Sequence, residues 1–170
     1  VARLSALTGA GNTVVVEADR GRGKSSAAGL AAAAMAAAGQ DVLVTAPGVD
    51  SAAELFARAN ELLATLGASD DSAEMDDSSE STQTATPPLS TTAGGRIRFA
   101  PPPEAATLPE APDVVIADEA AALPVAVLDS LLDAPAAGFC TTVHGYEGAG
   151  RGFAVRFRER LAASDHAVTD

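Results

Sequence analysis

The sequence predicts a single α/β domain in which a mostly parallel β-sheet is flanked by helices. Short apolar runs typical of buried strands occur at residues 13–17, 41–45, 114–117 and 138–143. Stretches with helical spacing lie between and after them, and this alternation is typical of parallel strands joined by right-handed crossovers. A length of 170 residues and an apolar content of 47% suit one domain with a sizeable core.

A glycine-rich segment connects the first predicted strand to the first predicted helix. It reads Ala18-Asp19-Arg20-Gly21-Arg22-Gly23-Lys24-Ser25-Ser26. A strand, this loop and a helix beginning at Lys24 form the context that a phosphate-binding loop requires. Backbone N–H groups can turn toward phosphate oxygens there, next to the positive end of the helix dipole. Lys24 would reach the β- and γ-phosphates of a nucleotide, and the Ser25 hydroxyl would ligate Mg²⁺. The pattern is relaxed, because Ala18 replaces its usual first glycine.

Two helices are predicted in the first half of the chain. The alanine-rich run at residues 27–38 ends at Gly39, a residue typical of helix C-termini. A second helix is expected to start at Asp50 or Ser51, either of which can cap it, and apolar residues recur at helical spacing as far as Leu66. This amphipathic helix is expected to cover the sheet.

Residues 68–95 are predicted to form a disordered acidic insertion. Ser, Asp, Glu and Thr dominate this segment, and apolar periodicity disappears. Pro87-Pro88 and Gly94-Gly95 punctuate its end. The alternative is a regulatory or partner-binding segment, although such charge runs are usually solvated loops.

The second half of the chain continues the alternation of strands and helices. Residues 96–99 alternate like an edge strand, and Pro124 suits the first position of a helix. A glycine-rich turn at 144–150 and a helix at 151–163 are expected to end the domain. Residues 1–11 resemble the last turns of a helix, so the natural chain is expected to extend upstream.

A pair of acidic residues follows the predicted strand at 114–117. Because consecutive strand residues point to opposite faces, Asp118 and Glu119 can take different roles at the end of that strand. Asp118 would hold Mg²⁺, and Glu119 would polarise an attacking water. The alternative is a charged helix cap before Pro124. The phosphate loop upstream favours a catalytic role for this pair, since ATP hydrolysis needs both a phosphate-binding loop and acidic residues that hold Mg²⁺ and activate water.

Three residues in the last quarter of the chain are further candidates. Thr142 and His144 follow the next strand, where a polar side chain could sense the γ-phosphate; the alternative is a strand threonine and a turn-capping histidine. Arg151 lies between two glycines at a predicted helix start, where its guanidinium could meet a phosphate. A Cys140–His144 nucleophilic dyad is excluded, because four residues along a strand span about 13 Å.

The composition limits the class of protein. The formal net charge of −12 argues against strong nucleic-acid binding through the overall field, so any RNA contact would be local. Lys24 is the only lysine, and this acidic, lysine-poor balance suggests a high-salt cytoplasm. Cys140 is the only cysteine, which excludes a disulfide framework and a cysteine metal cluster and indicates a reducing, cytoplasmic setting. No stretch approaches the roughly 20 apolar residues of a membrane span.

Three motifs in order resemble the ATPase module of the tRNA(Met) cytidine acetyltransferase family. They are Ala18-Asp19-Arg20-Gly21-Arg22-Gly23-Lys24-Ser25, then Asp118-Glu119-Ala120-Ala121-Ala122-Leu123-Pro124, then Thr141-Thr142-Val143-His144-Gly145-Tyr146-Glu147-Gly148-Ala149-Gly150-Arg151-Gly152-Phe153. They span nearly the whole chain apart from the acidic insertion. The composition points to a haloarchaeal member.

This resemblance implies a RecA-like P-loop NTPase domain that binds ATP and Mg²⁺. Gly21, Arg22, Gly23, Lys24, Ser25 and Ser26 would contact the phosphates, and Arg151 would be a further ATP contact. In the family, an acetyltransferase domain and an RNA-binding tail follow this helicase-type module, and ATP hydrolysis assists N4-acetylation of a tRNA cytidine. The acetyl-CoA site would lie outside these residues, as would an adenine-reading glutamine upstream of Val1.

The function expected from the sequence is therefore Mg²⁺-dependent ATP hydrolysis that serves RNA handling in a larger acetyltransferase. The alternative from another class is a nucleotide-binding scaffold that does not hydrolyse ATP and only orients its neighbours. A free-standing helicase would need a second RecA-like domain, for which this chain is too short.

Overall fold

The described part of the chain forms one α/β sheet structure. A computed structural model describes residues 12–19, 21, 23–70, 86–142, 159 and 167–169. The strands are β1 (Asn12–Ala18), β2 (Asp41–Thr45), β3 (Leu89–Ser90), β4 (Arg96–Phe99), β5 (Val114–Ala117), β6 (Ala136–Thr142) and β7 (Ala167–Thr169). The helices are α1 (Lys24–Ala37), α2 (Val49–Leu66), α3 (Pro102–Ala105) and α4 (Val125–Leu131), with a 3₁₀ turn at Ala120–Ala122.

The strands form a seven-stranded sheet in the order β3-β4-β2-β5-β6-β1-β7. Every neighbouring pair is parallel except β3 with β4. The predicted mostly parallel α/β domain is therefore confirmed. Because β6 lies between β1 and β5, the strand that leads into the predicted phosphate loop and the strand that precedes Asp118 are separated by one neighbour.

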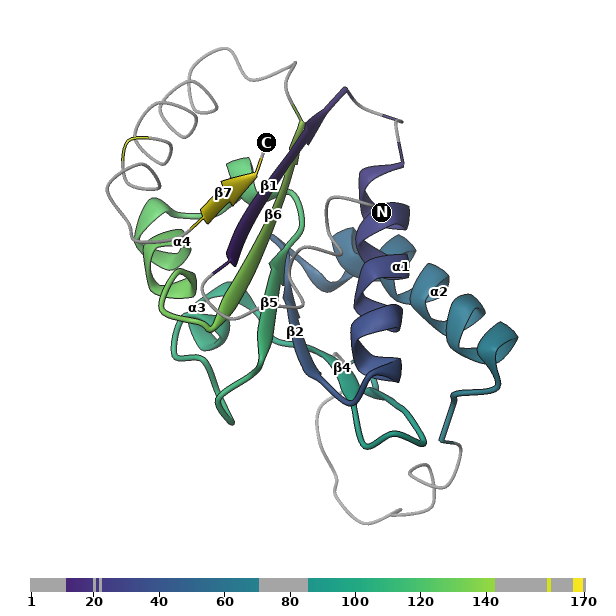
Figure 1. Cartoon of the computed structure of the whole chain (residues 1–170). Helices are drawn as coiled ribbons and strands as arrows, with labels where there is room; N and C mark the ends of the chain where they lie inside the picture. The colour runs from purple at the N-terminus through teal and green to yellow at the C-terminus, as the bar shows by residue number, and fades with distance from the viewer. Residues whose placement is uncertain are drawn as a thin grey trace.

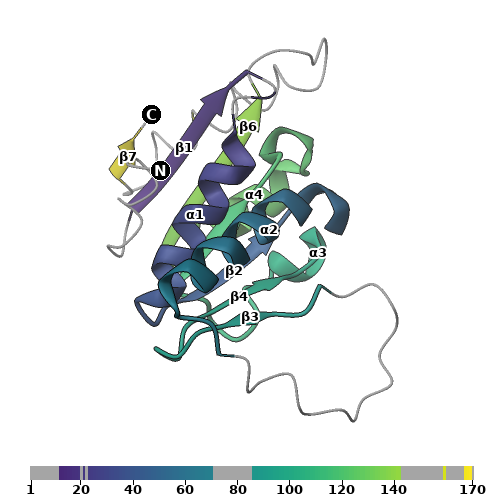
Figure 2. The same cartoon turned by 90° about the vertical axis from the view of Figure 1, so that its right-hand side faces the viewer.

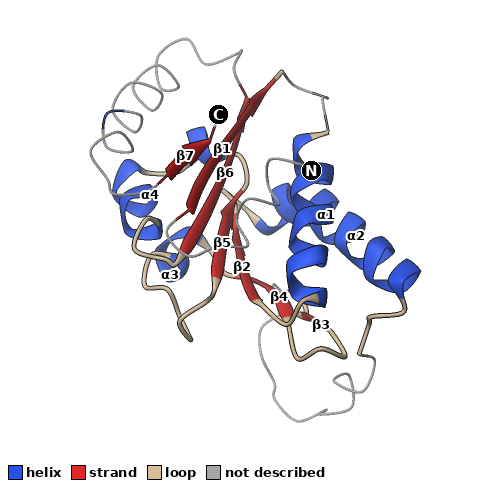
Figure 3. Ribbon diagram, in the orientation of Figure 1, coloured by secondary structure: helices blue, strands red, loops and turns tan. Residues whose placement is uncertain are grey.

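Helices cover both faces of this sheet (Figures 1 and 3). Helices α1 and α2 pack on one face, where alternate strand residues such as Val14, Val44 and Ile116 are buried. Helices α3 and α4 lie on the other face, over residues such as Val115 and Phe139. This two-sided burial explains why the central strands read as continuous apolar runs. No helix in the described residues is both long and apolar enough to span a lipid bilayer.

Helices α1 and α2 approach each other unusually closely, side by side in two views (Figures 1 and 2). A methyl group added at Gly29 of α1 would lie 2.3 Å from the backbone oxygen of Leu55 in α2. Only glycine lets the two backbones meet at this point. Direct backbone contact therefore fixes the distance between the residues of α1 and those of α2 near this point.

Several predicted elements are confirmed with small shifts. Helix α1 begins at Lys24 as predicted, and Gly39 follows its C-cap with φ +90°, in the left-handed conformation that glycine favours. The predicted cap of the second helix is wrong, because Gly48 occupies the N-cap position and no side chain caps α2. Leu66, predicted on its apolar face, is 56% exposed. Pro124 is the N-cap residue of α4, one position earlier than expected.

The prediction of disorder for residues 68–95 is wrong at both ends of the segment. Ser69 forms an isolated bridge with Thr91, and β3 pairs with β4, so β4 is not the edge strand that its alternation suggested. The Thr91 hydroxyl is buried, donates to the backbone oxygen of Ala36 at 2.9 Å and accepts from the N–H of Gly95 at 3.0 Å. This end of the segment is tied to the C-terminus of α1. Residues 71–85, in the middle of the prediction, lie outside the described residues.

A strand missing from the sequence prediction, β7, pairs with β1. The predicted turn at 144–150, the predicted helix at 151–163 apart from Glu159, and residues 1–11 lie outside the described residues.

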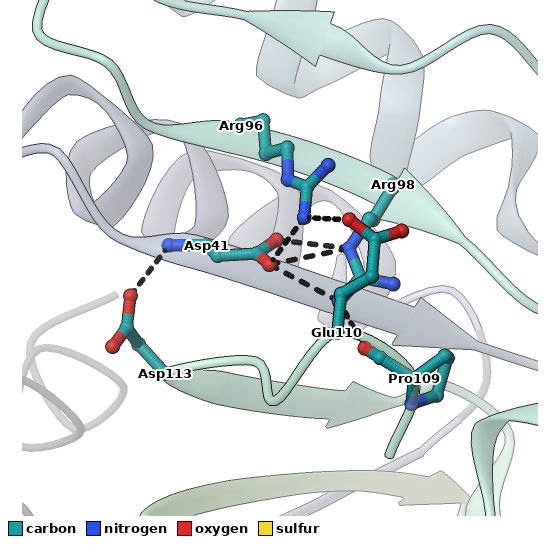
Figure 4. A network of polar contacts seen from close by, with 6 residues as sticks. All are labelled: Asp41, Arg96, Arg98, Pro109, Glu110 and Asp113. Carbon is teal, nitrogen blue, oxygen red and sulfur yellow. Dashed lines mark hydrogen bonds and ion pairs between the residues drawn. The ribbon is translucent and has the colours of Figure 1, made fainter. Parts of the chain in front are cut away.

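An ion-pair network ties together the amino ends of β2 and β4 (Figure 4), at the edge of the sheet opposite the carboxyl ends of the parallel strands. Asp41 Oδ2 accepts from Arg96 Nη2 at 2.9 Å, and Asp41 Oδ1 accepts from Arg98 Nε at 3.0 Å. Arg96 Nη2 also donates to Glu110 Oε2 at 2.6 Å, and Arg98 Nη2 donates to the Pro109 oxygen at 2.5 Å. Burial raises the pKa of Asp41, but hydrogen bonds from Arg98 and Arg96 outweigh it, so the net pKa is lowered.

Asp41→Asn is expected to lower the free energy of unfolding by about 2 kcal/mol, because the largely buried Arg98 loses its charged partner. Since the folded pKa of Asp41 is depressed, its contribution is present above the unfolded pKa and is lost as the pH falls below about 4. Urea unfolding at pH 7 and pH 3 checks both statements. Glu110→Gln is the control, since that carboxylate is 62% exposed and should matter little. Equal stability of Asp41→Asn and the parent at pH 7 would contradict the prediction.

Candidate nucleotide-binding site

The predicted phosphate loop joins the carboxyl end of β1 to the amino end of α1. Gly21 has φ +78° and Gly23 has φ +73°, a left-handed conformation that side chains rarely adopt. Gly23 is the N-cap residue of α1, and no side chain caps the helix or adds an acidic group to its first turn. The free N–H groups of this helix end are therefore available to an anion. Arg20 and Arg22 lie outside the described residues.

Lys24 folds back over the loop that precedes it. Its Nζ donates to the backbone oxygens of Ala18 and Asp19, each at 2.9 Å. Both acceptors are neutral carbonyl groups, so the ammonium charge is not neutralised by these contacts. The Lys24 ammonium thus places a positive charge at the mouth of the loop, beside the N–H groups of α1.

Asp118, directly after β5, is almost completely buried, with 1% of its surface exposed. Its Oδ1 accepts from the N–H of Glu119 at 3.0 Å, whereas its Oδ2 is buried without a hydrogen-bond partner. Burial raises the pKa of Asp118, and hydrogen bonding from Ser25 and from the Glu119 backbone opposes that rise. The Ser25 hydroxyl and the Asp118 carboxylate therefore lie close together, across the space between α1 and β5.

This pair suits Mg²⁺, which prefers oxygen ligands and typically takes one or two from the protein, with phosphate and water completing the shell. The unpaired buried oxygen of Asp118 is the group that such a cation would compensate. No group of three or more His, Cys, Asp or Glu side chains with metal-binding geometry occurs among the described residues. Ser25 and Asp118 could therefore hold Mg²⁺ only together with the phosphates of a ligand.

Glu119 differs from Asp118 in the exposure of its side chain and has an unusual backbone conformation. Its side chain is exposed, and it has φ 49° and ψ 41°, in the left-handed region that non-glycine residues rarely occupy. Such a conformation costs about 1–3 kcal/mol and is often kept at functional sites. The two acidic side chains therefore have the different environments that the sequence predicted, one buried beside Ser25 and one in solvent, although the left-handed turn at Glu119 and not strand alternation separates them.

Strand β6 places Thr142 between the loop and the acidic pair. Thr142 is the register partner of Ala18, the residue whose carbonyl accepts from Lys24. Cys140, two residues earlier and so on the same face, belongs to the core beneath α1. Burial, followed by the charge of Asp118, raises the pKa of Cys140 to about 12, which makes it an inert thiol. His144 and Arg151, the other sensor and ATP-contact candidates, lie outside the described residues.

One residue of this site was not identified from the sequence. The Ser26 hydroxyl, in the first turn of α1, donates a short hydrogen bond to Glu54 Oε1 on α2. Glu54 lies on the exposed face of an amphipathic helix, where glutamate is common, and no sequence pattern distinguishes it. The close packing of α1 on α2 brings it to the loop.

The sequence of the chain matches a known protein family. The helicase-domain model of the RNA cytidine acetyltransferase NAT10/TcmA family matches residues 15–170. The chain belongs to this family. The resemblance inferred from the three motifs is therefore confirmed.

Relatives named tRNA(Met) cytidine acetyltransferase TmcA match the chain over most or all of its length. The protein of Haloarcula marismortui is 60% identical and that of Haloferax volcanii 56% identical, each over 100% of this chain and 21% of the relative. The Vibrio cholerae protein is 37% identical over 87% of the chain and 19% of its own length. The chain thus spans about a fifth of the length of these NAT10/TcmA family members.

The fold resembles that of a solved ATPase. The large terminase ATPase domain of Thermus phage P74-26 superposes with a TM-score of 0.52 and 22% sequence identity, over 85% of this chain and 65% of that one. At this identity the likeness concerns the fold alone. It agrees with the α/β architecture of the NAT10/TcmA helicase domain.

Proposed function

We propose that this domain binds ATP with Mg²⁺ and hydrolyses it as the helicase-like module of a tRNA(Met) cytidine N4-acetyltransferase. The observation that carries the proposal is the juxtaposition, at the carboxyl ends of β1 and β5, of the Lys24 ammonium, the Ser25 hydroxyl and a buried Asp118 oxygen without a partner. Ligands of open α/β sheets bind at this edge. Membership of the NAT10/TcmA family supports the tRNA substrate of the whole protein.

Each residue has a distinct part in the proposal. The N–H groups of the loop and of the first turn of α1 bind phosphate oxygens, and Lys24 neutralises charge on the β- and γ-phosphates. Ser25 and Asp118 hold Mg²⁺, which supplies charge neutralisation at the transferring phosphoryl group. Glu119 orients and polarises the attacking water, and its exposed carboxylate is free to meet solvent. Thr142 senses the phosphate from β6, with His144 beside it in sequence, and Arg151 is a further ATP contact.

In the complete protein, hydrolysis would position the tRNA for acetylation. Acetyl-CoA would bind to another domain of the complete protein. The acidic net charge of −12 fits this division of labour, since strong RNA binding then belongs to neighbouring domains.

The second candidate is a nucleotide-binding scaffold without hydrolysis. The exposed position of Glu119 keeps this alternative open, because an exposed carboxylate is not held against any phosphate site by its neighbours. Binding of nucleotide without turnover would favour it.

Asp118→Asn tests the proposed magnesium site. In the parent protein, Mg²⁺ is expected to tighten ATP binding at least about tenfold, and Asp118→Asn should lose most of this gain, because the amide carries no charge. Without nucleotide the variant should be slightly more stable. Burial raises the pKa of Asp118, so the ionised carboxylate that is present at neutral pH destabilises the folded state, and a neutral amide does not. ATP titrations with and without Mg²⁺, and thermal unfolding, give the two readouts.

Asp133→Asn is the matched control, since Asp133 is exposed in the turn after α4 on the far face of the sheet. An unchanged Mg²⁺ effect in Asp118→Asn would refute the assignment of this residue. ATP binding that Mg²⁺ does not affect in the parent protein would refute the site as a whole.

A further inference from the structure

Glu54 is a carboxylate beside the first turn of α1, where free N–H groups and Lys24 favour an anion. It accepts the hydrogen bond of Ser26, the second hydroxyl of the phosphate loop, across 28 residues of sequence. Ser26 is half-buried and Glu54 is exposed, so the contact lies at the surface edge of the loop. Figures 1 and 2 show α1 and α2 packed next to each other on this face of the sheet.

The position of Glu54 is determined by backbone packing. Gly29 lies three residues after Ser26 on the same face of α1, and its Cα meets the backbone of Leu55, the residue next to Glu54. Ala52, Leu55, Phe56 and Ala59 of α2 are buried against the same core. The start of the Glu54 side chain therefore cannot move away from the loop without separating the two helices.

A carboxylate here would oppose phosphate binding if it had no other role. The first turn of α1 contains no acidic residue and supplies free N–H groups, and Lys24 adds a positive charge. A negative group next to these donors repels an anion bound by them. The combination is useful where the ligand joins a phosphate to a sugar, because a carboxylate near a phosphate-binding turn can accept a hydrogen bond from a ribose hydroxyl.

The Ser26 hydroxyl has one proton and can donate it to one acceptor at a time. When a phosphate oxygen takes this proton, Glu54 loses its donor. In the proposed complex Lys24 would meet the β- and γ-phosphates, and Ser26, two positions further along the helix, would meet the phosphate nearer the sugar. The ribose attached to that phosphate would then offer hydroxyl donors to Glu54.

We propose that Glu54 accepts a hydrogen bond from a ribose hydroxyl of the bound nucleotide and makes this site prefer ribonucleotides over deoxynucleotides. The inference rests on the proposed nucleotide site and deepens it. Glu54 is in this role a specificity residue, and the Ser26–Glu54 bond holds it in place before the ligand arrives.

The test uses the native full-length protein at a KCl concentration that keeps it folded. Dissociation constants are measured for MgATP, for its 2′-deoxy and 3′-deoxy analogues, and for magnesium tripolyphosphate, which has no sugar. Lys24→Ala supplies the background from other sites in the protein. ATP is expected to bind about tenfold more tightly than at least one deoxy analogue, the range of a hydrogen bond to a charged acceptor.

Glu54→Ala should bring that ratio to about one, while tripolyphosphate binds as well as before or more tightly. Glu54→Gln, which keeps a weaker acceptor, should show an intermediate ratio. Glu61→Ala is the matched control, because Glu61 is exposed on the same helix about 10 Å away and should leave the ratio unchanged.

Three results would overturn the inference in distinguishable ways. If the parent binds all three nucleotides equally, or if Glu54→Ala retains the preference, Glu54 does not contact the sugar although the nucleotide site stands. If Glu54→Ala lowers the dissociation constants of all ligands, tripolyphosphate included, by the same factor, Glu54 acts only by charge repulsion. If neither ATP nor tripolyphosphate binds above the Lys24→Ala background, the proposed function fails and the inference fails with it.

Discussion

Glu119→Gln is expected to leave MgATP binding nearly unchanged while the rate of hydrolysis falls by about two to four orders of magnitude, the usual contribution of a positioned general base. The amide keeps the size of the carboxylate but cannot accept a proton from water. Lys24, Ser25 and Asp118 remain to hold the nucleotide. The left-handed backbone at this position is unchanged by the substitution, so the fold should be unaffected. ATP affinity and ATPase rate, measured on one preparation of the full-length protein, give the comparison.

The same preparation allows acetylation of tRNA to be measured. Loss of both hydrolysis and acetylation would indicate that the two are coupled, and loss of hydrolysis alone would indicate an uncoupled ATPase. Unchanged hydrolysis would leave the scaffold as the better account. Glu104→Gln is the matched control, because Glu104 is an exposed glutamate in α3, on the face of the sheet opposite to α1.

Lys24→Ala is expected to weaken ATP binding at least about a hundredfold, which corresponds to roughly 2.7 kcal/mol. The substitution removes the one lysine of the chain from the mouth of the loop, where its ammonium donates to the carbonyls of Ala18 and Asp19. Water can replace these two contacts, so the melting temperature without nucleotide should hardly change. ATP titration and thermal unfolding are the two measurements.

Arg58→Ala is the control for a general loss of positive charge, since Arg58 is an exposed residue of α2 paired with Glu61. It should alter ATP binding little. Equal affinity of the parent and Lys24→Ala would remove the basis for a phosphate loop in this sequence. A large drop in melting temperature without nucleotide would show instead that Lys24 is needed for the fold.

Local signals were enough to predict most of the elements. The β-branched runs of β1, β2 and β5 and the alanine-rich run of α1 predict strands and a helix, because period and propensity act over a few residues. The start of α1 at Lys24 follows from the glycines before it, whose left-handed backbones are a local requirement. The meeting of Lys24, Ser25 and Asp118 at one edge was also predictable, because parallel strands end on the same side.

The segment at 68–95 shows where local signals mislead. Its composition is typical of disorder, yet the Thr91 hydroxyl is held by the backbone of Ala36 in α1 and by Gly95. One buried threonine is a weak signal among many exposed ones. The contact that orders it comes from a helix 55 residues earlier in the chain.

The sequence by itself determined which residues form the predicted phosphate loop and the acidic pair, since each motif is contiguous in the chain. The tertiary structure alone decided that β6 separates β1 from β5 and that Asp118 Oδ2 is buried without a hydrogen-bond partner. It also decided that Glu54 accepts a hydrogen bond from the Ser26 hydroxyl. These features depend on segments that are far apart in the chain. Burial and hydrogen bonding between such segments arise only when the helices and the sheet pack together, and no local period or propensity specifies which side chains will then meet.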